Sequence, residues 1–421
     1  MFEIQLEKIR NVIHEYPRVF WVLTVITFID RIGGALIFPF FGLYLTSKFG
    51  VGMTDVGVLF AAFSISSFAG SAVGGALTDR FGRKGVIIFG LFASSMSALA
   101  MGFAGSFQIF FFLAVFVGIL SDVSGPAHQA MVADILPEEK RADGYGILRV
   151  AFNLSVTIGP AIGGLLASKS FLGLFIADAA ISLVTVVLVW LFIPETKPEA
   201  HPDAPEQTVS ESFAGYGKVF RDTAFMLYLG AVLLQVLTYM NMNTTLGVYL
   251  RDEHGISMWH YGMLISLNAA MVVVLQFPIT RAIKHYPPML MMAFGTLFYA
   301  IGFAMYGFVA GYLMFVVAMI IITIGEMIVS PVGQALVASF SPADMRGRYM
   351  AVSGLSWGLP FAIGPYLAGR LLDGPHPQYL WFAAGIVGML SVLGFLMLHL
   401  VHGPIQLDDS ESTVASIQES A

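Results

Sequence analysis

GALTDRFGRK, residues Gly75 to Lys84, is a short charged stretch between two long apolar runs. Two membrane-spanning helices need a polar connection of this kind, whereas a soluble core does not. Its cations, Arg80, Arg83 and Lys84, favour the cytoplasmic side by the positive-inside rule. An ordinary basic loop would explain the cations, but it would not explain the glycines at these positions or the lone Asp79. The stretch therefore predicts a membrane protein in which this loop has a role of its own.

The composition agrees with a chain that lies mostly in lipid. Of 421 residues, 57% are hydrophobic and 11% are charged, against roughly 25% charged in a soluble globular chain. Runs of about 20 apolar residues can each cross a bilayer of about 30 Å. Because lipid offers the backbone no hydrogen bonds, such runs form helices, and they lack the alternation of barrel strands. We predict an all-α membrane protein with twelve transmembrane helices, at approximately 18 to 46, 55 to 77, 86 to 104, 108 to 133, 143 to 167, 172 to 193, 222 to 249, 258 to 280, 288 to 308, 312 to 337, 347 to 372 and 378 to 401.

The lysines and arginines predict the orientation. With the N-terminus inside, fifteen of them fall in cytoplasmic segments and four outside, namely Lys48, Lys169, Arg251 and Arg370. This bias predicts that both termini are cytoplasmic. The first 17 residues are amphipathic and lack the continuous apolar core and cleavage site of a signal peptide, so we expect them to stay attached.

Several classes of function are disfavoured. Acidic residues gather in the middle loop and the tail, so the net charge of −6 offers no basic surface for nucleic acid. Without cysteine, neither a disulfide nor a thiolate metal site can form. Histidine and carboxylate ligands remain open to a metal, but no pattern of them indicates a site. The phosphate-binding pattern GxxxxGK[ST] is absent, so nothing indicates ATP use. We expect no enzyme activity and no cofactor.

The chain contains an internal repeat with an offset of 205 residues. This shift aligns Pro126, Gln129 and Arg141 with Pro331, Gln334 and Arg346, and Gly50 with Gly255. Shared membrane composition would align Leu and Ala by chance, but not these residues through one gapless shift. We predict two six-helix halves, 1–193 and 221–401, a cytoplasmic linker at 194–220 and a disordered tail at 402–421. Parallel repeats of this kind place a substrate cavity between the halves at mid-depth. Because one chain holds both halves, a monomer is expected.

The charged stretch also resembles a known motif. Its pattern GxLxDRxGRK, with Gly75, Asp79, Arg80, Gly82, Arg83 and Lys84, is similar to the loop after the second helix in the major facilitator superfamily. In the second half the motif has decayed, since Asp79 falls on Lys284. The resemblance implies a transporter that works by alternating access, and a loop that acts as a conformational gate without contacting substrate. The resemblance implies that Asp79 lies near a helix terminus of the opposite half. A carboxylate at a helix N-terminus contributes about 0.3 to 1 kcal/mol, enough to bias two nearly balanced conformational states.

A second motif resembles the fifth helix of drug and proton antiporters in this superfamily. It comprises Gly159, Pro160, Gly163 and Gly164. Close helix packing by small residues and a proline kink would explain it equally well in any bundle. The chain departs from the antiporter pattern at Ser155, where a glycine is usual, and at Ala114, where the fourth helix usually has an arginine. Proton coupling would therefore need other groups.

Charged residues within the predicted spans are candidates for function, because burying a charge in lipid is costly. They are Asp30, Arg31, Asp122, Arg149, Asp178 and Glu326. The resemblance implies that the first, fourth, seventh and tenth helices line the cavity, which favours Asp30, Asp122 and Glu326 as protonatable or cation-binding groups. A fixed ion pair, such as Arg31 or Arg149 with Asp122, remains the alternative. Helix six is usually peripheral, so Asp178 is expected to have a structural partner or to face a neighbouring helix.

Neutral polar residues on the same helices add a recognition surface, to which we assign Tyr44, Gln235, Tyr239 and Asn241. The resemblance to the twelve-helix drug and proton antiporters implies that these residues and the carboxylates serve proton-coupled export of a small organic, amphipathic or cationic solute through an inner or plasma membrane. Two alternatives stay open. One is a dedicated carrier of a sugar, amino acid or lipid-like metabolite, and the other is a membrane sensor or scaffold that does not transport.

Overall fold

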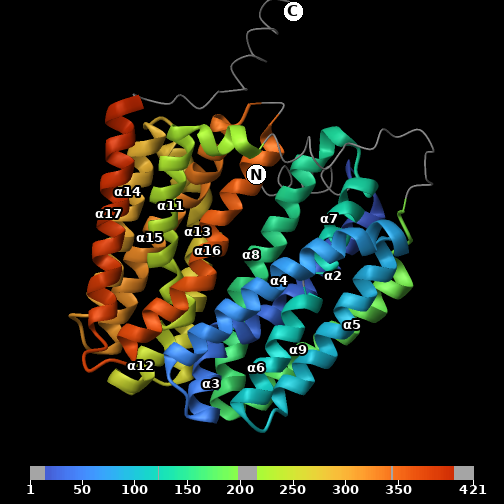
Figure 1. Ribbon diagram of the computed structural model, residues 1–421, viewed down its shortest axis with the longest axis horizontal. Helices are drawn as coiled ribbons and strands as arrows, with labels where there is room; N and C mark the ends of the chain where they lie inside the picture. The colour runs from blue at the N-terminus through green and yellow to red at the C-terminus, as the bar shows by residue number, and fades with distance from the viewer. Residues whose placement is uncertain (1–14, 122, 198–215, 343–344, 403–421) are drawn as a thin grey trace, which may run out of the picture. The chain divides into compact units, whose positions relative to one another are not determined.

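The structure is a computed structural model that describes residues 15–121, 123–197, 216–342 and 345–402. Within these ranges the chain is helical and contains no strand. Figure 1 shows the helices as long rods joined by short connections. Their bounds are α2 Arg18–Ile37, η1 Phe38–Phe40, α3 Phe41–Phe49, α4 Met53–Phe81, α5 Arg83–Gly102, α6 Phe107–Ser121, α7 Ser124–Ile135, α8 Glu138–Lys169, α9 Phe171–Phe192, α11 Thr223–Thr244, α12 Leu246–His254, α13 Met258–Ile283, α14 Pro288–Met305, α15 Tyr312–Phe340, α16 Arg346–Leu372 and α17 Tyr379–His402.

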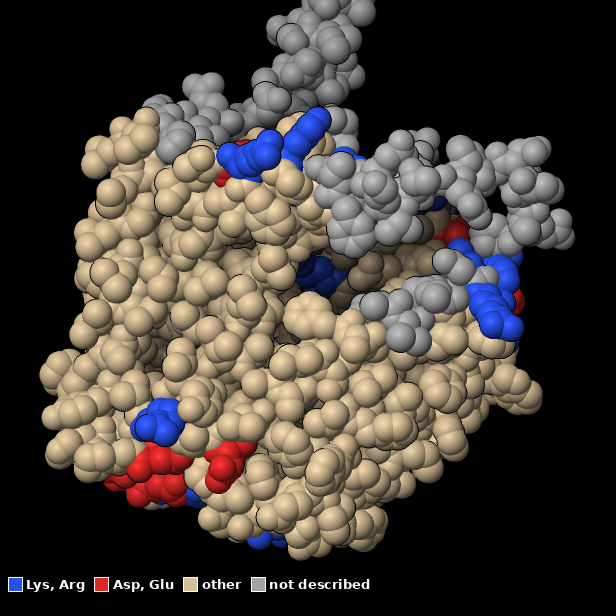
Figure 2. All heavy atoms as spheres, in the orientation of Figure 1, with Lys and Arg blue, Asp and Glu red and all other residues tan. Residues whose placement is uncertain are grey.

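The chain is a multi-pass membrane protein. Eleven stretches in the described residues are long and apolar enough to span a bilayer. The helix α16 is not among them, although its 27 residues occupy the place of the predicted span 347 to 372. Large apolar side chains such as Phe112, Phe277 and Leu400 remain exposed, as lipid contact requires. On the face shown in Figure 2, most charged side chains gather at the ends of the helices.

The helices repeat with the offset found in the sequence. Five helices of the first half begin 205 residues before a helix of the second half. The pairs are α2 with α11, α4 with α13, α5 with α14, α6 with α15, and the short α3 with α12. The last pair also ends alike: Gly50 and Gly255 follow α3 and α12 in the left-handed conformation, with φ of 65° and 64°. Glycine adopts this conformation without the steric cost of a Cβ, which explains its place in both copies.

Contacts divide the chain into two compact units. Unit 1 comprises 1–203, 241–273 and 362–375, and unit 2 comprises 204–240, 274–361 and 376–421. The division differs from the two sequence halves because two segments of the second half cluster with the first. The core of unit 1 includes Phe20, Met131 and Val189. That of unit 2 includes Phe225 and Phe395.

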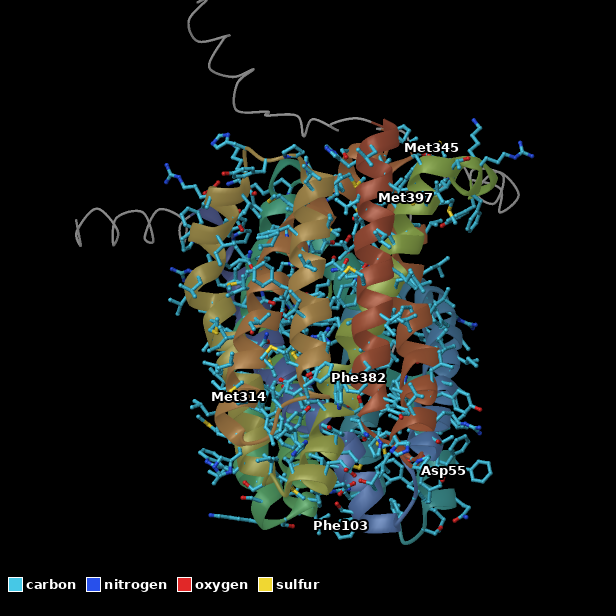
Figure 3. The ribbon with its side chains drawn as sticks, turned by 90° about the vertical axis from the view of Figure 1, so that its left-hand side faces the viewer. Asp55, Phe103, Met314, Met345, Phe382 and Met397 are labelled. Atoms are coloured by element: carbon cyan, nitrogen blue, oxygen red, sulfur yellow. The ribbon has the colours of Figure 1, made fainter. Side chains whose placement is uncertain are left out.

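Unit 2 is seen from the side in Figure 3. Met345 and Met397 lie toward the end of the bundle where α17 finishes, and Met314 lies toward the opposite end, where α15 begins. The middle of α11 and the middle of α15 are therefore both remote from the ends of the bundle. Polar groups at that depth need partners within the protein.

Candidate functional site

A carboxylate lies near the middle of a spanning helix in unit 2. Glu326 belongs to α15, and its Oε1 accepts a hydrogen bond of 3.0 Å from the hydroxyl of Tyr239 on α11. The structure thus brings together two predicted site residues that are 87 positions apart in the sequence.

Aromatic rings surround this hydrogen bond. The ring centroid of Tyr239 lies 5.4 Å from that of Tyr299 and 6.3 Å from that of Trp357, which it meets edge-on at 75°. Glu326 is close enough to Tyr299 to interact with it electrostatically. Tyr299 is 3% exposed, whereas Trp357 is 52% exposed. We call Tyr239, Tyr299, Glu326 and Trp357 the carboxylate–aromatic cluster.

Two glycines let α14 and α15 come close enough to form this cluster. A Cβ on Gly325 would lie 2.5 Å from the backbone oxygen of Gly295 and 3.0 Å from Cδ1 of Tyr299. Small residues at helix contacts permit such an approach in membranes. Because Gly325 precedes Glu326 directly, the same contact brings the ring of Tyr299 beside the carboxylate.

Gln235 lies one turn before Tyr239 on α11. Its side chain is 4% exposed, and its Oε1 has no hydrogen-bond partner in the part of the chain that the structure describes. A buried acceptor without a donor costs about 1 to 3 kcal/mol. This predicted site residue therefore faces the protein interior as an unused acceptor.

In unit 1, two carboxylates lie near each other between α2 and α9. A Cβ on Gly33 would lie 2.3 Å from Oδ1 of Asp178, so the carboxyl group of Asp178 fills the space that Gly33 leaves. Asp30 precedes Gly33 by three residues and shares its face of α2. Asp178 and Asp30 are within electrostatic reach of each other. We call them the carboxylate pair. Asp178 thus faces a neighbouring helix, and the carboxylate that it faces is a predicted site residue.

Arg31 and a histidine lie near the pair. The guanidinium of Arg31 is 5.9 Å from the ring centroid of Phe152, and among the described side chains it forms no ion pair. His128 Nε2 lies 2.9 Å from the hydroxyl of Thr27, and Arg31 is within electrostatic reach of His128. Asp122, predicted as a protonatable or cation-binding residue with an ion pair to Arg31 or Arg149 as the alternative, lies outside the described residues.

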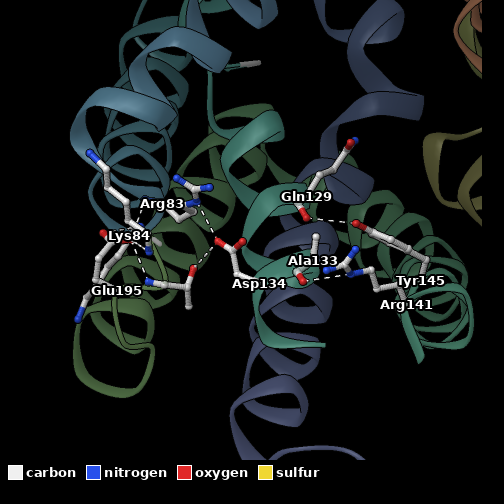
Figure 4. A network of polar contacts seen from close by, with 10 residues as sticks. Arg83, Lys84, Gln129, Ala133, Asp134, Arg141, Tyr145 and Glu195 are labelled. Atoms are coloured by element: carbon white, nitrogen blue, oxygen red, sulfur yellow. Dashed lines mark hydrogen bonds and ion pairs between the residues drawn. The ribbon is translucent and has the colours of Figure 1, made fainter. Parts of the chain in front are cut away.

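The predicted gate loop forms a network of polar contacts at one end of unit 1 (Figure 4). Arg83 Nε donates to Asp134 Oδ2 at 2.9 Å, with the two side chains 12% and 19% exposed. The carboxylate of Glu195 accepts the backbone N–H groups of Arg83 at 2.8 Å and Lys84 at 3.2 Å. Lys84 Nζ donates to the backbone oxygen of Trp190 at 2.8 Å. The loop is therefore fixed to α7 and to the segment after α9.

This network requires a glycine at position 82. Its φ is +88°, and a Cβ there would lie 2.5 Å from Oε2 of Glu195. Burial acts to raise the pKa of Glu195, but backbone hydrogen bonds from Arg83, Lys197, Thr196 and Lys84 outweigh it and leave the pKa below its ordinary value. The carboxylate therefore stays ionised at the start of α5, where a helix favours negative charge.

Sequence reasoning missed Glu195, because it assigned residues after 193 to a linker without chemistry. The available signal was an acid two residues beyond a predicted span, on the same side as a basic loop. Of the other predicted gate residues, Arg80 accepts a hydrogen bond from Lys197 Nζ at its backbone oxygen, at 3.0 Å. Gly75 and Asp79 fall within α4, but their surroundings lie outside what the structure describes.

The family model of the Major Facilitator Superfamily matches residues 23–259 and 230–417, which is most of the chain. The chain belongs to this superfamily. It is a membrane transporter, as the resemblance of its charged loop implied.

Relatives agree over nearly the whole length. A Planococcus maritimus protein named Na(+), Li(+), K(+)/H(+) antiporter is 27% identical over 399 residues, which cover 87% of this chain and 92% of the relative. The multidrug resistance protein MdtH of Shigella flexneri is 24% identical over 372 residues, covering 86% and 89%. A crystal structure of a POT family transporter with a thioalcohol-conjugated peptide covers 91% of this chain and 96% of its own, with a TM-score of 0.77 and 16% identity. One of the nucleoside transporter NupG covers 91% and 99%, with a TM-score of 0.73 and 12% identity. These two structures show the fold alone.

In this transporter the helix-five motif makes close helix contacts. A Cβ on Gly159 would lie 2.4 Å from Cβ of Ala35, and one on Gly163 would lie 2.5 Å from the backbone oxygen of Leu36, both on α2. Gly164 packs against α13, where a Cβ would lie 3.1 Å from the backbone oxygen of Met258. The packing role considered for this motif is therefore present, and Pro160 lies inside α8.

Two other predicted cavity residues lie in packed surroundings of unit 1. Tyr44 is buried, with its ring 4.8 Å from that of Phe175, and its hydroxyl donates to the backbone oxygen of Met101 at 3.2 Å. Asn241 is buried, and its Oδ1 accepts from the hydroxyl of Thr245 at 3.0 Å.

A further set of contacts in unit 1 joins segments from both sequence halves. Asp373, after α16, accepts the backbone N–H groups of Met53 at 2.8 Å and Thr54 at 2.7 Å. Arg251 on α12 donates to Thr46 Oγ1 at 3.0 Å and to the hydroxyl of Ser47 on α3. Sequence reasoning did not select either residue.

Proposed function

We propose that this transporter exports small organic solutes, amphipathic or cationic, by alternating access in exchange for protons. The observation that carries the proposal is the carboxylate pair, Asp30 and Asp178, within two spanning helices. Two part-buried carboxylates that interact electrostatically within spanning helices cannot both be charged without a cost, because like charges repel and the surroundings are apolar. Exchange of a proton relieves that cost. Ionisable residues at such positions commonly mark ion and proton pathways.

The remaining predictions complete the proposal. The protein would lie in the inner or plasma membrane with both termini in the cytoplasm, as the lysine and arginine bias predicts. The two sequence halves, 1–193 and 221–401, would move against each other, and the gate network around Arg83 would hold one state. The chain would act as a monomer without a cofactor. The similarity to MdtH, which is named a multidrug resistance protein, supports export of organic solutes.

A second candidate is exchange of alkali cations for protons. It is favoured by the similarity to the Planococcus maritimus protein, whose name states that exchange. The carboxylate pair could serve either cargo, since carboxylate oxygens bind hard cations as well as protons. The two candidates differ in what must move against the proton.

Transport assays in liposomes test the proposal. Purified protein is reconstituted with a pH-sensitive dye inside, a proton gradient is imposed, and tetraphenylphosphonium, ethidium, Na⁺, K⁺, glucose and an amino acid mixture are added in turn. We expect an organic cation or amphipathic solute to drive proton movement. In Asp30→Asn and in Asp178→Asn this movement should be lost.

The matched control is Asp55→Asn, which neutralises an exposed acid on α4. It should leave proton movement unchanged. A response confined to Na⁺ and K⁺ would establish the second candidate, and a response to one metabolite would indicate a dedicated carrier. Absence of proton movement with every solute would refute the proposal.

A further inference from the structure

We propose that an organic cation binds at the carboxylate–aromatic cluster by replacing the hydroxyl of Tyr239 as the partner of Glu326. This rests on the proposed function and names the solute class and the residues that select it. The cluster belongs to unit 2, whereas the carboxylate pair, to which we assign the proton, belongs to unit 1.

The cluster combines the features that a cation requires. Glu326 offers a carboxylate, and the rings of Tyr239, Tyr299 and Trp357 offer faces that carry partial negative charge. A cation over such a ring gains about 0.5 to 1 kcal/mol when exposed and about 2 kcal/mol when desolvated. An anion would be repelled by Glu326, and a neutral solute would gain nothing from its charge. The chemistry therefore selects an apolar body with a positive charge.

We infer that the cation first contacts the cluster at Trp357. At 52% exposure its indole is half open, although it contacts the buried part of the cluster through the ring of Tyr239. Tyr299, which also contacts the ring of Tyr239, is buried. A cation that stacks on Trp357 is therefore next to Tyr239, whose hydroxyl binds the carboxylate of Glu326.

The hydroxyl of Tyr239 occupies the place of the ligand in this structure. Its hydrogen bond of 3.0 Å satisfies Oε1 of Glu326, which would otherwise lie in a low-dielectric region with one partner fewer. A hydrogen bond to a charged group contributes about 1.5 to 3 kcal/mol. A bound cation must compete with that bond. Removal of the hydroxyl should therefore strengthen cation binding, whereas removal of an aromatic face should weaken it.

Binding measurements on the purified, full-length protein test these opposite effects. Tetraphenylphosphonium is titrated calorimetrically at about pH 8, with neutral triphenylphosphine oxide as the uncharged probe. We expect Tyr239→Phe to bind the cation about 3- to 10-fold more tightly. Trp357→Ala should bind it about 5- to 30-fold more weakly, with Trp357→Phe between it and the wild type. Glu326→Gln should lose the preference for the cation over the neutral probe.

Matched controls separate binding from folding. Tyr228→Phe removes another hydroxyl from α11, one that donates to the backbone oxygen of Gly333 at 3.0 Å. Trp259→Ala removes a part-exposed indole from unit 1. Both should leave cation affinity unchanged, and the melting temperature of every variant shows that it is folded.

Weaker or unchanged binding in Tyr239→Phe would overturn the inference, as would equal affinity for the neutral probe. These results are distinguishable from failure of the proposed function. Proton-coupled transport of neutral solutes alone would leave that function standing and remove this inference. Opposite effects of Tyr239→Phe and Trp357→Ala on cation affinity, without any proton movement, would support the cation site and refute proton-coupled export.

Discussion

The carboxylate of Asp373 caps the first turn of α4, accepting the N–H of Met53 at 2.8 Å across 320 residues of sequence. The neighbouring N–H of Thr54 binds the other carboxylate oxygen at 2.7 Å. A Cβ on Gly52 would lie 2.5 Å from that same oxygen, so glycine leaves room for the acid. An anion at a helix N-terminus is favourable both through the free N–H groups and through the helix dipole. This contact ties a segment of the second sequence half to the first.

Asp373→Asn should weaken that tie, because an amide keeps one acceptor and loses the charge. We expect a cost of about 1 kcal/mol to the conformation seen here. The cysteine-free chain permits paired spin labels at Val51→Cys and Arg370→Cys, whose distance distribution should gain a longer component. Asp55→Asn, in the same first turn of α4, should leave the distribution unchanged. An unaltered distribution in Asp373→Asn would show that the contact does not hold this conformation.

The gate network should depend on pH through Glu195. Because the folded-state pKa of Glu195 lies below its ordinary value, its stabilising effect is present above about pH 4.3 and is lost as the pH falls through the folded value. Amide hydrogen exchange at Arg83 and Lys84 should thus show less protection at acidic pH, after correction for the intrinsic rate. In Glu195→Gln the protection should already be low at neutral pH and should vary little with acidification. A normal pH response in that variant would assign the effect to another group.

The ion pair between Arg83 and Asp134 should show measurable coupling. Both side chains are largely shielded from solvent, so salt screens them less than an open surface pair. A double-mutant cycle with Arg83→Ala and Asp134→Ala should give a coupling energy of about 1 kcal/mol. The measurement is reversible denaturant unfolding in detergent. Strictly additive effects would mean that the pair contributes nothing to stability.

Two glycines of α8 should respond oppositely to alanine. Gly159→Ala places a methyl group 2.4 Å from Cβ of Ala35, which should cost about 1 to 3 kcal/mol through overpacking. Gly146→Ala meets nothing within 4 Å and should stabilise the helix by about 0.5 to 1 kcal/mol. Thermal unfolding followed by tryptophan fluorescence compares the two. Equal effects would mean that α2 moves aside at no cost.

The sequence predicted the fold well because both signals, apolar length and the 205-residue repeat, are local or periodic. It also selected Glu326 and Tyr239, since a carboxylate and a tyrosine within apolar runs are conspicuous. Their contact was beyond reach, because it depends on how Gly325 and Gly295 bring α14 against α15. Helix periodicity alone does not say which helices become neighbours.

Asp178 shows a different limit. Its sequence context predicted a structural partner or a neighbouring helix opposite it, but not that its carboxyl group would lie against Gly33, on the face of Asp30. The space for that carboxyl group exists only because residue 33 lacks a side chain. Glu195 was missed because its partners are backbone N–H groups. Every residue except proline has such a group, so no sequence pattern indicates which ones a carboxylate will bind.

The constant spacing of helix starts has a consequence for the history of this molecule. Between the first and second copies, from α2 to the end of α7 and from α11 to the end of α15, no net insertion or deletion has accumulated. The copies therefore keep one register over these stretches, and residues 205 positions apart can be compared directly. Asp30 corresponds to Gln235, and Glu326 corresponds to Ser121. Single replacements at equivalent places thus gave one ancestral scaffold two chemically different halves.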